Sequence, residues 1–139
     1  MDLNCLAPCG IDCVNCELYG RNSTDEYIAA VASRLGRDPE SLRCKGCREQ
    51  GGCSFFSGCE TLACVTRKGF AFCSECPDFP CPRLQPASDR ADKIPHNYKV
   101  YNLCRIAKVG PEAFLEEAPL IRKRYYEGKM RIGAGPQLR

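Results

Sequence analysis

The sequence predicts a small, irregular, α-rich domain (α+β at most), stabilised by metal ions, whose Cys-rich loops pack on a few short helices. Thirteen cysteines occur in 139 residues, roughly twice what an inert globular protein needs. Eight of them fall in the segment 44–81, which is rich in Gly and Pro and poor in long apolar runs. Such a segment cannot bury enough side chain to order itself. We therefore expect metal–thiolate bonds to replace a hydrophobic core there.

Chain length suits one compact unit with two regions. Residues 1–84 form the predicted Cys-rich metal-binding region, and residues 85–139 form a helical C-terminal extension with a mobile tail. The start lacks the basic and apolar parts of a signal peptide, and no stretch approaches the roughly 20 apolar residues of a membrane span. We expect a cytoplasmic protein, because dense cysteines in a reducing compartment mark metal sites more often than disulfides. A secreted disulfide scaffold is the alternative.

The first cysteine cluster occupies residues 5–16. Cys9, Cys13 and Cys16 have the spacing C-x3-C-x2-C, which is also found in radical enzymes that cleave S-adenosylmethionine. Those enzymes need a large αβ barrel to enclose the radical, and this chain is too short to supply one. A three-cysteine corner completed by a distant cysteine remains open, for zinc or for an iron–sulfur cluster.

An amphipathic helix is predicted over about 23–35. Ser23 and Glu26 have the spacing of a capping box, and Gly36 is the expected terminator. The apolar positions between them recur at helical spacing: Tyr27, Ile28, Val31 and Leu35. The stretch 38–40 reads as a cap followed by a proline at the first position of a short turn. This turn leads into the main cysteine segment.

Two Cys-x-x-Cys turns, 44–47 and 73–76, lie in the main segment with twenty-five residues between them. Such turns direct backbone N–H groups toward the sulfurs, which favours the thiolate. One scheme joins these two turns in a single site and leaves Cys59, Cys64 and Cys81 for the N-terminal cluster. Interleaved schemes are equally open, because spacing alone cannot choose.

The C-terminal part predicts helices. Residues 82–95 read as an exposed connector, and a helix is expected from about 97 to 108, ending near Gly110. Pro111 begins another helix, and Pro119 predicts a break or kink before a last helix over 120–127. The tail from residue 128 onward is expected to be extended or mobile. Any strands are expected as short hairpins within 44–81.

Three further features have alternative interpretations. Cys104 is expected to be a small buried hydrophobe, and His96, the only histidine, is expected to be exposed. A basic patch with aromatics could follow a phosphate backbone, or its cations could complement a helix dipole while the tyrosines pack inward. Its members are Arg122, Lys123, Arg124, Tyr125, Tyr126, Lys129 and Arg131. Two zinc sites with four thiolates each would take the net charge from +3 to −1, so composition does not favour nucleic acid.

The order of these motifs resembles the Cys-rich family called domain of unknown function 3795. The matching stretches are 8–19, 44–47, 59–64 and 68–81, the last ending in Cys-Pro-Asp-Phe-Pro-Cys. The resemblance implies a metal-binding role and no reaction. The cysteines that it implicates are Cys9, Cys13, Cys16, Cys44, Cys47, Cys59, Cys64, Cys73, Cys76 and Cys81. Cys5, Cys53 and Cys104 fall outside the pattern.

The functional prediction is a metal-binding protein with all-Cys sites. With a single histidine, the sites must be nearly all sulfur, which favours structural zinc, two or three ions, over an open catalytic zinc. A binding or interaction module is expected rather than an enzyme, with a protein partner the first possibility. The alternatives are a [4Fe–4S] protein that transfers electrons or assists a partner enzyme, and a nucleic-acid-binding zinc protein that uses the 122–131 patch.

Overall fold

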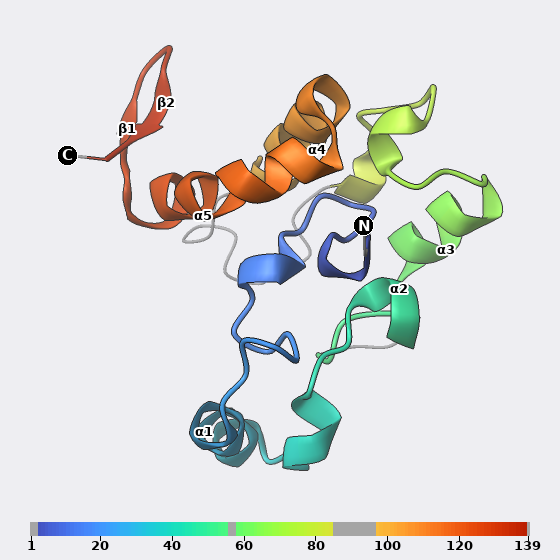
Figure 1. The fold of residues 1–139 in the computed structure, drawn as a ribbon. Helices are drawn as coiled ribbons and strands as arrows, with labels where there is room; N and C mark the ends of the chain where they lie inside the picture. The colour runs from blue at the N-terminus through green and yellow to red at the C-terminus, as the bar shows by residue number, and fades with distance from the viewer. Residues whose placement is uncertain (1–2, 56–57, 85–96, 139) are drawn as a thin grey trace.

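The computed structural model describes residues 3–55, 58–84 and 97–138 (Figure 1). The helix-rich fold class predicted for a small Cys-rich domain is confirmed. No helix within the described residues is both long enough and apolar enough to cross a membrane. The helices are α1 (Asp25–Leu35), α2 (Cys47–Gln50), α3 (Glu60–Arg67), α4 (Tyr98–Val109) and α5 (Pro111–Glu127). Short 3-10 turns connect them: η1 (Leu3–Cys5), η2 (Cys13–Asn15), η3 (Pro39–Leu42), η4 (Cys73–Glu75) and η5 (Pro82–Leu84).

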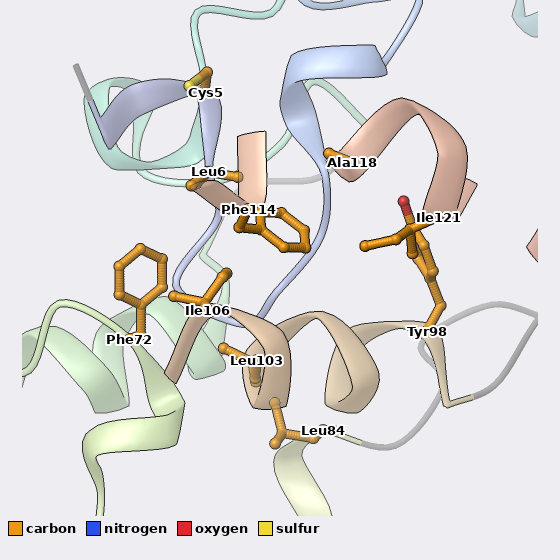
Figure 2. Packing of buried hydrophobic residues seen from close by; sticks show 10 residues of the cluster. All are labelled: Cys5, Leu6, Phe72, Leu84, Tyr98, Leu103, Ile106, Phe114, Ala118 and Ile121. Carbon is orange, nitrogen blue, oxygen red and sulfur yellow. The ribbon is translucent and has the colours of Figure 1, made fainter. Parts of the chain in front are cut away.

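The main hydrophobic cluster joins the N-terminal loop to the α4–α5 pair (Figure 2). Its buried members are Cys5, Leu6, Phe72, Leu84, Tyr98, Leu103, Ile106, Phe114, Ala118 and Ile121. Packed apolar side chains therefore supply more of the order than expected, because the two C-terminal helices bring the apolar surface that the cysteine loops lack. The cluster draws on residues from both predicted regions, and the division near residue 84 stays a prediction.

A second, smaller cluster lies around α1. Leu18, Ile28, Ala32, Leu42 and Cys44 are its buried members. Figure 1 places α1 at the end of the molecule away from α4 and α5. The cluster therefore fixes α1 to the two chain segments that flank it.

The N-cap predicted for α1 at Ser23 was wrong by one residue. Thr24 is the N-cap, and its Oγ1 accepts a hydrogen bond from the backbone N–H of Tyr27 at 3.2 Å. The Ser23 hydroxyl instead donates to the carbonyl of Gly20. Gly36 ends the helix in the left-handed conformation, as expected (φ 62°).

The predicted buried face of α1 was also too wide. Tyr27 and Leu35 are 43% and 45% exposed, whereas Ile28 is 1% exposed. Helix α1 has eleven residues and packs against one small cluster, so only a narrow stripe of its surface is buried. The turn after α1 is as predicted. Asp38 is its N-cap, and the Asp38 carboxylate accepts a hydrogen bond from the backbone N–H of Glu40. Pro39 stands at the start of the turn.

Of the break or kink predicted at Pro119, the break does not occur, because α5 continues through Pro119 and includes the separate helix expected over 120–127. Phe114 and Ala118 are buried before the proline and Ile121 is buried after it. Packing of both halves on one cluster holds the helix continuous, although proline removes one backbone hydrogen bond. The expected boundary between the two C-terminal helices is confirmed at Gly110 and Pro111.

The tail forms an antiparallel hairpin of β1 (Lys129–Arg131) and β2 (Gly135–Gln137). The tail is therefore extended, as expected, but the expectation that any strands would lie within 44–81 was wrong. Within the described part of 44–81, no β-strand occurs apart from the isolated bridge of Cys44 to Tyr19. Gly133 and Gly135 have φ values of 80° and 74°, a conformation that glycine adopts readily and that lets the chain reverse. Most of the predicted connector, together with His96, lies outside the described residues.

Replacing Pro119 with alanine should raise the free energy of unfolding by about 1–3 kcal/mol, because alanine restores the missing N–H and has the highest helix propensity. Chemical denaturation followed by circular dichroism measures the change. Glu116→Ala, at an exposed position of the same helix, is the control and should change stability by less than about 0.5 kcal/mol. A less stable Pro119→Ala protein would show that the proline ring itself stabilises α5.

Candidate metal centre

Backbone pairing brings the N-terminal cysteine loop beside the turn at Cys44. The N–H of Cys44 donates to the carbonyl of Leu18 at 2.9 Å, and the N–H of Gly20 donates to the carbonyl of Cys44 at 2.8 Å. Tyr19 and Cys44 form an isolated parallel bridge. These contacts place the Cys13–Cys16 turn next to the Cys44–Cys47 turn, although α1 and η3 separate them in the sequence.

Asp12 shapes the first turn. Its carboxylate accepts from the backbone N–H of Asn15 at 3.2 Å and from the Asn15 side-chain amide at 2.7 Å, so it caps η2. The N–H of Cys16 then donates to the carbonyl of Cys13. The Asn22 amide closes the loop from outside through the carbonyls of Val14 and Cys16.

The turn at Cys44 directs donors at its sulfur. The N–H of Gly46 lies 3.4 Å and the side-chain amide nitrogen of Gln50 lies 3.5 Å from the Sγ of Cys44. Gly46 has φ 94°, and a Cβ there would lie 2.4 Å from the carbonyl oxygen of Asn4. Only glycine suits this position, because a side chain would be strained and would clash with the backbone.

Six sulfurs form the first cysteine group: Cys9, Cys13, Cys16, Cys44, Cys47 and Cys59. Burial raises the pKa of the Cys13 thiol, and the neighbouring Cys47, Cys16, Cys44 and Cys9 raise it further. Burial also raises the pKa of Cys47 to about 12, with Cys9 and Cys59 acting in the same direction. The chain thus brings together three predicted ligand segments, around residues 9–16, 44–47 and 59.

Four sulfurs form the second cysteine group: Cys64, Cys73, Cys76 and Cys81. All four line a cavity of about 560 Å³ between α3 and the η4 and η5 turns. Burial raises the pKa of Cys73 to about 11, and the neighbouring Cys9, Cys81, Cys64 and Cys76 act in the same direction. The N–H of Cys73 donates to the carbonyl of Pro8 at 2.9 Å, so the loop that carries Cys9 lies against both groups.

Cations flank the second cysteine group. Lys68 places its Nζ 3.2 Å from the Sγ of Cys76 and 2.6 Å from Oδ2 of Asp78, and this ammonium lowers the pKa of the Asp78 carboxyl. Arg83 lines the same cavity and pairs with Glu60 at 2.7 Å. Donors aimed at sulfur stabilise thiolate over thiol.

Arg48 lies between the first cysteine group and the main hydrophobic cluster. Its Nε donates to the carbonyls of Leu3 and Leu6 at 3.1 and 2.9 Å, and its Nη2 donates to the carbonyl of Ala71 at 2.7 Å. The guanidinium lies over the ring of Phe72, 4.9 Å from its centre. Sequence reasoning missed this residue, which nothing in its local sequence distinguishes.

Few carboxylates in the described part of the chain lie near Arg48 to balance its positive charge. Burial lowers the pKa of its guanidinium, and the neighbours that act in the opposite direction are Cys47, Cys13, Glu75 and Cys9. Among the described residues, no carboxylate forms a salt bridge with it, and Glu75 accepts a hydrogen bond from the N–H of Ala71. Most of the groups that could balance the charge are therefore cysteines.

All thirteen cysteines are free thiols, which excludes the disulfide scaffold as the state of this structure. Within the described ranges, no three His, Cys, Asp or Glu side chains converge closely enough to hold an ion as they stand. The two groups are thus neighbourhoods of sulfur, whose donor chemistry fits thiophilic metals. The scheme that joins the 44–47 and 73–76 turns is less favoured, because the first turn lies with Cys13 and Cys16. The ligand assignment itself stays a prediction.

The three remaining cysteines have different environments. Cys5 is buried in the main cluster and Cys53 is half-buried. Cys104 is exposed, so its predicted burial was wrong. Leu103 and Ile106 turn the inner face of α4 toward the cluster, and the intervening position Cys104 therefore points outward.

Two members of the basic patch, Arg122 and Tyr125, make contacts within the protein. Arg122 pairs with Glu17 at 3.3 Å and lies 4.8 Å from the centre of the Tyr126 ring. Tyr125 packs against Tyr98 and Tyr101, with ring centres 5.3 and 5.5 Å apart. These contacts give Arg122 and Tyr125 structural roles, as the inward-packing interpretation expects, whereas Tyr126 is 51% exposed.

Comparison with known proteins identifies a family. A family model described as "Protein of unknown function (DUF3795)" matches residues 5–86, which is more than half of the chain. That range includes every cysteine of both groups. No curated protein and no solved structure matches the chain.

The stability of the metal-free protein should fall as the pH rises from about 9 to 11. The ordinary thiol pKa is 9.0, whereas the folded values are about 12 for Cys47 and about 11 for Cys73. In this window the unfolded chain releases protons that the folded chain retains, so alkali favours unfolding. Below pH 9 both states keep these protons, and the two thiols add no pH dependence.

Urea unfolding at several pH values measures this effect. The double variant Cys47→Ser/Cys73→Ser should show a shallower fall than the parent, while Cys104→Ser should keep the parent slope. The lysines and tyrosines are common to all three proteins and cancel in the comparison. A slope unchanged by the double variant would contradict the burial of these thiols.

Proposed function

The chain belongs to the DUF3795 family, and from that premise we propose that it is a metal-binding protein whose two cysteine groups hold zinc in structural sites. The first cysteine group would hold its metal between the turns at 13–16 and 44–47, with Cys9 and Cys59 available. The second cysteine group would hold its metal with Cys64, Cys73, Cys76 and Cys81. Two ions with four thiolates each would use eight of the ten predicted ligands, and three ions would have to share thiolates.

The observation that carries this proposal is the position of Arg48. A half-buried guanidinium that faces neutral thiols would be poorly compensated, and buried charges are normally paired. Zinc bound by four thiolates carries a net charge of −2, so metal loading would turn the sulfurs near Arg48 into its counter-charge. Bound zinc would supply a cross-link between distant loops, and the binding energy would be largely folding energy.

The role that fits such sites is a binding or interaction module. Zinc would fix the cysteine loops, and their surface would meet a partner, with a protein the first candidate. We place the protein in the reducing cytosol, where free thiols persist and structural disulfides are rare. We assign it no reaction.

A second candidate is an iron–sulfur protein, and the cavity beside the second cysteine group favours it. Its volume of about 560 Å³ exceeds what one tetrahedral ion between four sulfurs needs. Cys64, Cys73, Cys76 and Cys81 would hold the cluster, which would supply electron transfer to the protein or to a partner enzyme. The Lys68 ammonium beside Cys76 would then stabilise the negative charge on the Cys76 sulfur.

Metal content decides between the two candidates. Protein purified without oxygen should be colourless and contain two or three zinc per chain by elemental analysis. Iron together with visible absorption would reject zinc in favour of the cluster. A folded protein with neither metal would reject metal binding itself.

Cys73→Ser should lower metal content and soluble yield together, because each structural zinc contributes on the order of 10 kcal/mol to folding. Cys104→Ser is the matched control, since it makes the same change at an exposed cysteine outside both groups. Elemental analysis and the circular dichroism signal after chelation are the measurements. Unchanged metal content in Cys73→Ser would remove that residue from the ligands.

A further inference from the structure

Two polar side chains of α4 hold the loop that carries the first cysteines. The Tyr98 hydroxyl donates to Oδ2 of Asp12 at 3.0 Å, and the Asn102 amide donates to the carbonyl of Gly10 at 2.8 Å. Tyr98 is 5%, Asp12 1% and Asn102 0% exposed. Residues 98 and 102 are one turn apart and share a face of the helix. Figure 2 shows Tyr98 rising from α4 beside Ile121 of α5.

The loop backbone lies directly on this helix face. Gly10 has φ 85°, and a Cβ there would lie 2.4 Å from the carbonyl oxygen of Lys99 and 2.9 Å from the Leu103 side chain. Only glycine lets the loop approach so closely. The hydrogen bonds of Tyr98 and Asn102 thus act on a backbone already pressed against α4.

The contact from Tyr98 continues to the sulfurs through Asp12. The same carboxylate that accepts from Tyr98 also caps the η2 turn through Asn15, and that turn carries Cys13. Asp12 is therefore held from two sides, by the cysteine turn and by α4. A shift of the helix would rotate the turn and redirect its sulfur.

Asn102 adds a second indication. Its Oδ1 is buried and has no hydrogen-bond partner among the described residues. An unpaired buried oxygen is unfavourable, so an apolar residue would suit the packing at this position better. What asparagine adds is the amide that holds Gly10.

We propose that Tyr98 and Asn102 are positioning residues of the first cysteine group, which aim Cys9 and Cys13 at the bound metal and so set its affinity. The inference rests on the proposed metal-binding function and extends it beyond the family-matched range 5–86 to the C-terminal helix. Hydrogen-bonded partners behind metal ligands commonly change metal affinity about 10- to 100-fold when removed. The hydrogen bonds of Tyr98 and Asn102 described above go to the first loop, so the second cysteine group should not respond.

Tyr98→Phe separates positioning from simple helix docking. It removes only the hydroxyl and keeps the ring, which packs against Tyr125 and Tyr126 with centres 5.3 and 5.9 Å away. Tyr101→Phe is the matched control, because it makes the same change on the same helix at a residue 38% exposed. Asn102→Ala tests the other contact and gives a second reading should Tyr98→Phe fold poorly.

The experiment transfers zinc from each loaded protein to a coloured chelator and follows the rate. Tyr98→Phe should release part of its zinc about 10- to 100-fold faster than the parent, with the rest released at the parent rate. Tyr101→Phe should behave as the parent. Cobalt in place of zinc should give altered metal absorption bands in Tyr98→Phe, a signature that loss of helix packing alone would not produce.

Two results would overturn the inference and leave the proposed function intact. One is zinc release from both Tyr98→Phe and Asn102→Ala at the rate of Tyr101→Phe. The other is equally faster release of all the zinc together with loss of helical signal, which would assign the two residues to helix docking alone. A parent protein without bound metal would instead overturn the proposed function and this inference with it.

Discussion

The backbone pairing of residues 18–20 with Cys44 is the contact on which the sulfur arrangement depends. This pairing joins the two ends of the segment that contains α1 and η3, and it places the Cys13–Cys16 turn beside the Cys44–Cys47 turn. The small cluster of Leu18, Ile28 and Leu42 supports the closure from the side of α1. Without this backbone pairing, only a long flexible connection would join the two turns, and they would not be held together.

Apolar packing is unevenly distributed along the chain. The α4–α5 pair supplies most large buried side chains, so part of the molecule has an ordinary core. The cysteine loops contribute few apolar residues, and burial keeps their thiols protonated in the absence of metal. A metal would have to displace those protons, which couples its binding to pH as well as to folding.

Local signals predicted local features well. Gly36, Gly110 and Pro111 mark helix boundaries because their backbone preferences act within a few residues. Features that depend on distant contacts were missed or wrong. Pro119 lies inside a helix because both halves pack on one cluster, and Cys104 is exposed because its neighbours take the inner face. The hairpin after α5 was likewise missed, because its six strand residues show no clear alternation of apolar and polar side chains.

The sequence by itself determined the helical class and the family, and it predicted a set of sulfur ligands, since composition, motif order and short-range spacing are properties of the chain. Only the tertiary structure decided which sulfurs are neighbours, that Arg48 faces them, and that α4 holds the loop of Asp12. The physical reason is that spacing limits which cysteines can meet but does not select among them. The selection comes from backbone pairing and helix packing between residues far apart in the sequence.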